Sequence, residues 1–279
     1  MNIFEETKFI MNKYDVHPNK RLGQNFLFDE QSLQTIASEV TSEDTVIEIG
    51  PGLGTLTAIL AEKASKVIAV ELDSNMVQIL EDRFKLYNNV QIIQDDILYV
   101  DIDKIAPKAK IVANLPYYIT TSIITKLLNT NIKDITILIQ KEVAERICAE
   151  PGTKKAGAIT YYVKYYADSK IVANVPKECF IPSPEVESAV VKITKRNEKA
   201  VKVNNEKLFF DIIKTNFTQR RKTILNSLSS IIDKEVLKNI LKECKIEEVE
   251  RGENLSLEQF AMIANLFDEL DKDKTTNRK

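Results

Sequence analysis

One glycine-rich stretch constrains the fold of this chain more than any other: residues 48–54, E-I-G-P-G-L-G. The β-branched segment before it is typical of a buried strand, and residues 55–65 after it space their apolar side chains as a helix does. Alternating glycines allow a tight turn and let a ligand lie on the main chain at the positive end of the helix. The dinucleotide fingerprint requires glycine where Thr55 stands. The stretch therefore predicts a nucleoside-binding loop of another type, or only a tight strand-to-helix turn.

Strands and helices alternate after this loop, which predicts a doubly wound α/β sheet. We expect strands at 66–70, 90–93, 110–113 and 135–140, with helices between them. Ligands of such sheets bind outside the carboxyl ends of the strands. Residues 25, 50, 71, 96 and 114 are all expected at that one edge.

Acidic residues follow two of these strands. Glu71 lies 21 residues after Gly50, the distance at which a carboxylate accepts hydrogen bonds from ribose hydroxyls. A carboxylate after the 90–93 strand is placed to receive an adenine amine. Asp95 and Asp96 are both present there, so chemistry alone leaves that choice open.

The tetrapeptide Asn114-Leu115-Pro116-Tyr117 follows the 110–113 strand and resembles the [Asn/Asp/Ser]-Pro-Pro-Tyr class of methyltransferases, which modify exocyclic amines of bases. An amide oxygen and a main-chain carbonyl can accept both N–H bonds of such an amine, which aims its lone pair at a methyl donor. The tyrosine offers a flat surface for a base taken out of its stack. The alternative is a proline turn with a buried tyrosine.

Composition limits the remaining choices. The chain has 279 residues, 44% hydrophobic and 29% charged, the balance of a globular protein with one or two domains. It holds no apolar run of about 18 residues, so we expect no membrane span. Cys148, Cys179 and Cys244 are few and far apart, which favours reduced thiols in the cytoplasm and no zinc site. His17 is the only histidine, which disfavours Ser-His or Cys-His catalysis.

The second half of the chain changes character. Tyrosines at 161, 162, 165 and 166 have helical spacing and are interpreted as packing residues. Phe180 precedes a loop fixed by two prolines, where it could stack on the other face of the base. Residues 195–203 read as a linker, and helical spacing continues beyond it. We therefore expect a methyltransferase domain at 1–198 and a helical C-terminal domain that binds RNA at 199–279.

The net charge of −2 conceals a local basic band. Residues 195–222 hold nine Lys or Arg against three acids, whereas acids exceed bases by twelve to nine from Leu225 onward. Such asymmetry is typical of a phosphate-binding face. Arg220, Arg221 and Lys222 are the predicted RNA contacts, with a solvated helix face as the alternative.

Together, the motifs resemble those of the small-subunit ribosomal RNA adenine N6,N6-dimethyltransferases from about Arg21 to Leu270. They are G-Q-N-F-L at 23–27, E-I-G-P-G-L-G at 48–54, E-L-D at 71–73, N-L-P-Y at 114–117, F-x-P-x-P-x-V-x-S at 180–188, N-F-x-x-R-R-K at 216–222 and N-L-S at 254–256. The resemblance implies a seven-stranded Rossmann-like sheet with its last strand antiparallel. It also implies four methyl transfers from S-adenosyl-L-methionine to two adjacent adenosines near the 3′ end of small-subunit rRNA, in an immature subunit. We expect a monomer that needs no metal.

Residue roles follow from the same resemblance. It implies that S-adenosylmethionine contacts Asn25, Leu27, Gly50, Glu71, Asp96 and Asn114. Asn114 and the Leu115 carbonyl would orient the amine, and Tyr117 and Phe180 would sandwich the adenine. The choice of Asp96 over Asp95 rests on alignment with the family's acid.

Three other functions remain as alternatives. A large-subunit rRNA adenine methyltransferase shares the sheet and a similar Asn-x-Pro-Tyr, but the 180–188 motif and the helical tail favour the small-subunit enzyme. An RNA-binding assembly factor with little catalysis would be expected to lose the acids or the tetrapeptide, and both are present. Thr55 disfavours a nicotinamide-dependent enzyme.

Overall fold

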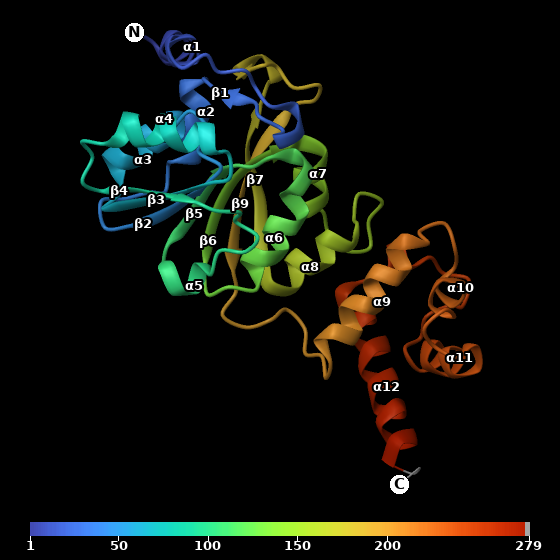
Figure 1. Cartoon of the computed structure of the whole chain (residues 1–279). Coiled ribbons are helices and arrows are strands. Elements are labelled where there is room, and N and C mark those ends of the chain that lie inside the picture. Colours follow the sequence, from blue (N-terminus) through green and yellow to red (C-terminus); the bar gives the residue numbers. More distant parts are fainter. Residues whose placement is uncertain (277–279) are drawn as a thin grey trace. The chain divides into compact units, whose positions relative to one another are not determined.

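The chain folds around one mixed seven-stranded sheet in a computed structural model that describes residues 1–276. The strand order is β4-β3-β2-β5-β6-β9-β7 (Figure 1). A separate two-stranded sheet pairs β1 with β8. The strands are β1 Phe26–Leu27, β2 Thr45–Ile49, β3 Lys66–Glu71, β4 Val90–Gln94, β5 Lys110–Asn114, β6 Asp134–Gln140, β7 Ala167–Val175, β8 Phe180–Ile181 and β9 Ser188–Lys195.

Five neighbouring strands of the sheet, β4 to β6, are parallel, and β9 then pairs antiparallel with β6. The inner strands are apolar along nearly their whole length because helices cover a sheet of this kind on both faces. Val46 and Ile47 of β2 are fully buried, as are Ile135 and Ile137 of β6. The expected α/β fold with an antiparallel last strand is confirmed.

Helices connect these strands, and two of them pack on the β3–β4 side of the sheet: α3 against β3 and α4 against β4. The α-helices of the first part are α1 Ile3–Lys13, α2 Glu30–Ile36, α3 Thr55–Lys63, α4 Ser74–Phe84, α5 Ile102–Ile105, α6 Thr120–Leu128, α7 Lys141–Ile147 and α8 Ala158–Tyr166. The short 3-10 turns are η1 Lys20–Leu22, η2 Tyr117–Ile119 and η3 Lys177–Cys179. Asp29 caps α2 by accepting from the Ser32 amide.

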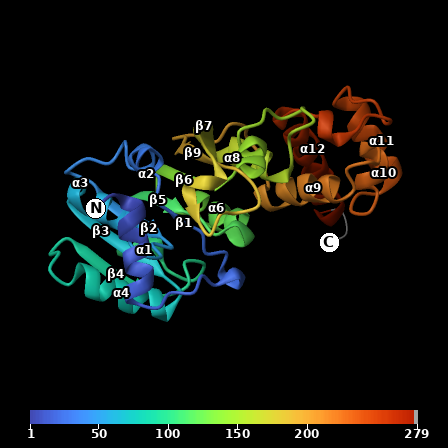
Figure 2. The same cartoon turned by 90° about the horizontal axis from the view of Figure 1, so that it is seen from above.

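The first helix, α1, lies next to α4 in both whole-chain views (Figures 1 and 2). Ile10 of α1 packs with Met76 and Ile79 of α4 in a small cluster that also holds Phe26 and Leu53. The N-terminal segment is therefore part of the core beneath the glycine loop.

The chain divides into two compact units. The sheet unit comprises residues 1–144 and 169–195, and the helical unit comprises residues 145–168 and 196–279. The helical unit adds α9 Glu206–Thr218, α10 Ile224–Leu228, α11 Lys234–Glu243, η4 Gly252–Asn254 and α12 Leu257–Thr276. Its core includes Tyr161 and Tyr165 of α8 together with Phe209 and Phe260.

The structural division differs from the expected boundary at residue 198 in one respect. Residues 145–168 belong with the helical unit because the buried tyrosines of α8 pack on its aromatic core: the ring centroids of Tyr161 and Phe260 lie 5.2 Å apart. The tyrosine stripe is thus packing, as predicted. An RNA-binding role for residues 199–279 stays a prediction.

Candidate functional site

The glycine loop passes from β2 into α3 with a backbone that favours glycine at two crowded positions. Gly54 has φ +80°, and a Cβ on it would lie 2.6 Å from the Phe84 ring. Gly52 has φ +56°, with the Phe26 ring 3.1 Å from the position of its Cβ. Side chains are excluded at both positions by conformation and by space. The loop is thereby pressed onto α4 and β1 while its other side faces a pocket.

Glu71, at the end of β3, holds the loop in place. One carboxylate oxygen accepts from the Gly52 amide at 3.0 Å, and the other accepts from the amides of Leu72 and Asp73. The side chain is buried, and burial raises its pKa above the ordinary value while the three N–H donors partly offset that rise. A carboxylate has about four acceptor positions. The oxygen that faces Gly52 therefore keeps one for a ligand hydroxyl.

The two acids after β4 both line the pocket. Asp95 accepts from the amide of Asp96, and one oxygen of Asp96 accepts from the amide of Leu98. Asp95 is exposed, whereas Asp96 is half-buried. The structure thus brings both candidates to the edge where a carboxylate was expected, and it favours neither by geometry alone.

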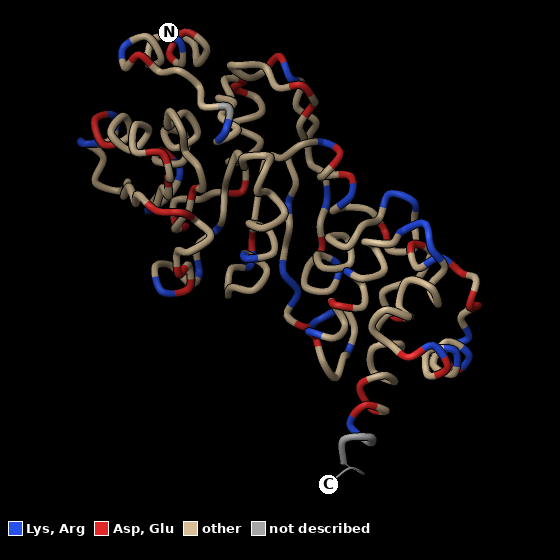
Figure 3. Tube along the Cα trace, turned by 45° about the vertical axis from the view of Figure 1, so that its right-hand side comes forward, with Lys and Arg blue, Asp and Glu red and all other residues tan. Residues whose placement is uncertain are grey.

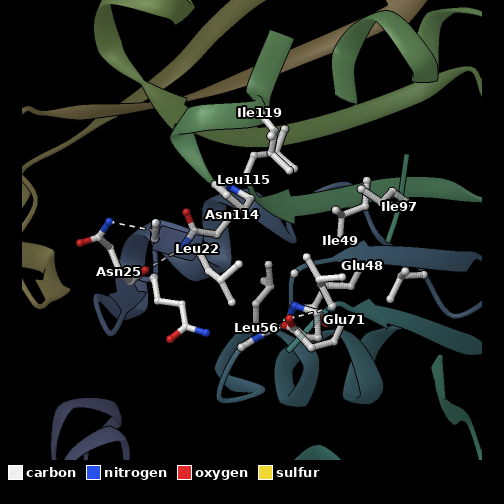
Figure 4. A pocket seen from close by; sticks show the side chains of 18 of the residues that line it. Leu22, Asn25, Glu48, Ile49, Leu56, Glu71, Ile97, Asn114, Leu115 and Ile119 are labelled. Carbon is white, nitrogen blue, oxygen red and sulfur yellow. Dashed lines mark hydrogen bonds between the residues drawn. The ribbon is translucent and has the colours of Figure 1, made fainter. Parts of the chain in front are cut away.

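Asn114, at the end of β5, is oriented by the segment before β1. Its amide nitrogen donates to the main-chain carbonyl of Asn25 at 3.1 Å, and the Asn25 amide in turn donates to the Gly23 carbonyl. Figure 4 shows Asn25 and Asn114 on one side of the pocket and Glu71 with Glu48 on the other. Because the Asn114 nitrogen is committed to a carbonyl, its amide oxygen is the group available to accept a hydrogen bond.

The two residues that follow shape the floor. The Leu115 amide donates to Leu138 of β6 at 3.0 Å, and the Thr120 hydroxyl donates to the Pro116 carbonyl at 3.0 Å. Tyr117 lines the pocket, and its hydroxyl shares a 2.6 Å hydrogen bond with Ser188.

These segments enclose one pocket with an empty volume of about 1040 Å³, including the part open to solvent. That is the upper end of the size range of small-molecule sites. It brings together eight residues predicted from separate motifs: Asn25, Leu27, Gly50, Glu71, Asp96, Asn114, Leu115 and Tyr117.

Phe180 is the exception. Its ring is 3% exposed and packs in an apolar cluster with Leu27 and Leu33, and β8 pairs Phe180 with Leu27 of β1. It does not line the pocket, so the expected stacking of Phe180 on an adenine does not fit this arrangement. The sequence predicts Phe180 at the mouth of a loop fixed by prolines, where it could stack on the base, but in this structure apolar neighbours cover its ring.

The sequence model of the family described as ribosomal RNA adenine dimethylase matches residues 16–269. This chain belongs to that family. The ribosomal RNA small subunit methyltransferase A of Clostridium botulinum (strain Loch Maree / Type A3) is 47% identical over 267 residues, covering 93% of this chain and 97% of that protein. The protein of the same name in Clostridioides difficile (strain 630) is 44% identical over 94% of each chain.

Solved structures give the same fold. A dimethyladenosine transferase from Plasmodium falciparum superposes with a TM-score of 0.74 at 26% identity, over 88% of this chain and 98% of that one. The 23S rRNA methyltransferase ErmE, at 24% identity and a TM-score of 0.68 over 88% of this chain and all of that one, shares the fold. The chain is thus a methyltransferase of the rRNA adenine dimethylase family with the class I fold.

The sequence of this dimethylase-family chain does not reveal how two residues beneath the loop, the buried Glu48 and the half-buried Arg83, are placed. Glu48 is 1% exposed, burial raises its pKa to about 8, and its Oε2 has no hydrogen-bond partner in the described part of the chain. Arg83 of α4 donates to the Leu53 carbonyl in the loop and to Glu6 of α1 at 2.6 Å. Glu48 belongs to the glycine-rich motif, as the acid two residues before its first glycine, whereas no local sequence pattern indicates a role for Arg83.

The basic band of this family member is partly neutralised within the helical unit. Arg220 pairs with Glu253 at 2.5 Å and donates to the Lys154 carbonyl. Arg221 and Lys222 are exposed and form no ion pair with any described residue. Figure 3 shows acidic and basic residues intermixed along the trace of this unit. Arg220 therefore has a structural role, and the predicted RNA contact rests on its two neighbours.

Two further properties concern the whole described chain. None of the helices within residues 1–276 is long and apolar enough to cross a membrane. Over the same residues, no group of three or more His, Cys, Asp and Glu side chains is arranged to hold a metal ion.

Proposed function

We propose that this chain transfers methyl groups from S-adenosyl-L-methionine to N6 of two adjacent adenosines near the 3′ end of small-subunit rRNA. The proposed substrate is an immature small ribosomal subunit in the cytoplasm, and the proposed enzyme is a monomer. The orientation of Asn114 carries the proposal: its nitrogen is held by Asn25, so its oxygen is presented as an acceptor at the end of β5. An acceptor of this kind suits an exocyclic amine. The names of the relatives supply the class of RNA.

The pocket fits the cofactor. Gly50 has φ +65°, and the nearest heavy atom to a Cβ on it would be 3.9 Å away, in Pro116. A side chain there would occupy pocket space, so the main chain is open to a ligand at that point. Glu71 would accept from a ribose hydroxyl, Asp96 from the adenine amine, and Asn25 and Leu27 would line the remaining wall.

The residues of this chain would act by orientation. When bound, S-adenosylmethionine supplies an electrophilic methyl group on a sulfonium. The Asn114 oxygen and the Leu115 carbonyl would accept hydrogen bonds from the two N–H groups of the amine. These bonds stabilise a geometry in which the nitrogen lone pair is aimed at that methyl group. Tyr117 would stack on the base. The alkylated nitrogen carries an extra proton and can lose it to water, so no basic side chain is required.

The experiment uses small subunits from cells that lack this modification. Incubation with the purified chain and S-adenosylmethionine should give N6,N6-dimethyladenosine at two adjacent positions near the 3′ end, detected by mass spectrometry of nuclease fragments. Large subunits serve as the parallel substrate. Methylation of an adenosine in the large-subunit rRNA alone would contradict the proposed substrate.

A further inference from the structure

One hydrogen bond joins the N-L-P-Y segment to the segment that ends at Ser188. The hydroxyls of Tyr117 and Ser188 lie 2.6 Å apart although the residues are 71 positions apart in the chain. Ser188 is completely buried, whereas Tyr117 is half-buried and lines the pocket. A buried serine hydroxyl needs a hydrogen-bond partner. The partner of Ser188 is the hydroxyl of Tyr117, the aromatic residue that follows Asn114 and Leu115 most closely in the sequence.

The sheet explains why a residue of β9 can reach this pocket. Since β9 runs antiparallel to β6, it begins at the edge where the parallel strands end, and Ser188 is paired with Gln140, the last residue of β6. The residue before Ser188 is held in the same way, because the Lys141 amide donates to the Glu187 carbonyl at 3.0 Å. Ser188 is thus held by the sheet and not by a loop.

Tyr117 is held at its other end by the main chain. The Pro116 carbonyl accepts from the Thr120 hydroxyl at 3.0 Å, which caps the turn that carries Tyr117. With the backbone fixed at one end and the hydroxyl at the other, the position and the long axis of the ring are determined. Burial raises the pKa of the Tyr117 phenol, so the hydroxyl keeps its proton at neutral pH.

We propose that Ser188 is a positioning residue for methyl transfer: it fixes the position and long axis of the Tyr117 ring, and thereby where the target adenine stacks beside Asn114. This inference rests on the proposed function. With Phe180 covered by the core, Tyr117 is the aromatic residue of the two predicted stacking partners that faces the pocket. A ring free to tilt would hold the amine in the reactive geometry for less of the time. The second transfer should suffer more, because a methylated amine has fewer acceptable orientations.

The test is a double-variant cycle of Tyr117→Phe and Ser188→Ala, followed by single-turnover formation of mono- and dimethyladenosine on unmodified small subunits. Each single variant should slow the second transfer about three- to ten-fold, the usual worth of one hydrogen bond. The double variant should be no slower than the slower single one, because both remove the same bond. The dissociation constant for S-adenosylmethionine should change less than two-fold. Ser188→Thr, which keeps a hydroxyl, should be faster than Ser188→Ala.

Matched controls separate positioning from stability. Tyr166→Phe removes a phenol bond to Glu206, and Ser227→Ala removes a buried hydroxyl bond to Asn216. Both should alter the melting temperature without changing the ratio of the two transfer rates. A Tyr117→Phe enzyme as fast as wild type, or single-variant effects that multiply in the double variant, would overturn the inference. A wild-type enzyme that forms no dimethyladenosine would contradict the proposed function and this inference with it.

Discussion

The amide nitrogen of Asn114 lies 3.1 Å from the main-chain carbonyl of Asn25, to which it donates. The two residues come from segments 89 positions apart, and each was predicted separately to contact the cofactor. The bond fixes which face of the Asn114 amide meets a substrate. The segment before β1 therefore helps to build the proposed acceptor site and also lines the pocket.

Replacement of Asn114 should separate chemistry from binding. Asn114→Ala removes the acceptor of the amine, so we expect methyl transfer to slow by about 100-fold or more, as when one group of a preorganised charge-stabilising site is lost. The affinity for S-adenosylmethionine should fall much less. Single-turnover rates and calorimetry measure the two quantities. Asn89→Ala is the control, since Asn89 donates to the carbonyls of Ala61 and Ala64 outside the pocket. Equal losses of rate and affinity for Asn114→Ala would contradict the assignment.

Replacement of Glu71 should weaken binding of the cofactor. Glu71→Gln places a donor where the carboxylate now accepts from Gly52, Leu72 and Asp73, so the glycine loop should loosen. Loss of a buried acceptor costs about 1–3 kcal/mol, which corresponds to roughly a five- to 150-fold larger dissociation constant. Isothermal calorimetry with S-adenosylmethionine measures it. An unchanged constant would remove Glu71 from the site.

Glu48 should make stability depend on pH. Its folded pKa of about 8 lies above the ordinary value of 4.5, so the folded state keeps a proton that the unfolded chain releases. The free energy of unfolding should therefore decline as pH rises from 4.5 to 8. Glu48→Gln stays neutral, and relative to wild type it should gain on the order of a few kcal/mol across that window. Urea unfolding at pH 5, 6.5 and 8 tests this. A stability difference that is the same at all three pH values would show that Glu48 does not titrate as proposed.

Arg83 should couple the first helix to the glycine loop. Arg83→Ala removes both the donor to the Leu53 carbonyl and the partner of Glu6. We expect a loss of about 1–3 kcal/mol of stability, weaker binding of S-adenosylmethionine, and faster proteolysis within residues 1–14. Lys85→Ala is the matched control, because the ion pair of the exposed Lys85, just after α4, is with Asp82 and not with the glycine loop or α1. Equal protease sensitivity of the two variants would contradict the coupling.

The basic band should divide into a structural and an RNA-binding part. Arg221→Ala with Lys222→Ala should reduce the slope of log affinity for small subunits against log salt by about two, one for each lost phosphate contact. Arg220→Ala should lower the melting temperature, because it leaves Glu253 without its closer partner. Filter binding at several salt concentrations and thermal melts distinguish the two. An unchanged slope for the double variant would favour a solvated face.

The sequence predicts the sheet and most of the pocket because both depend on local patterns. A run of apolar residues marks each strand, and polar residues at the ends of parallel strands must meet at one edge, which places Glu71, Asp96 and Asn114 together. The helices after residue 205 are marked in the same way by their apolar spacing.

Other features depend on contacts between distant side chains and leave no local pattern. Nothing near Arg83 in the sequence indicates that it reaches the glycine loop, and nothing near Phe180 indicates that its ring is buried in an apolar cluster. The hydrogen bond of Ser188 is of the same kind. The motif included this serine, but its partner is determined by where β9 enters the sheet.

The position of β9 also governs the order in which the protein can be completed during its own synthesis. Residues 188–195 leave the ribosome after every other strand of the sheet, yet β9 lies between β6 and β7. Until residues 188–195 emerge, one edge of β6 is unpaired and β7 has no neighbour in the sheet. Closure of the sheet must therefore wait for a contact between segments far apart in the chain, which is slow relative to local folding. A nascent chain stalled before residue 188 should hold the glycine loop but not the finished pocket.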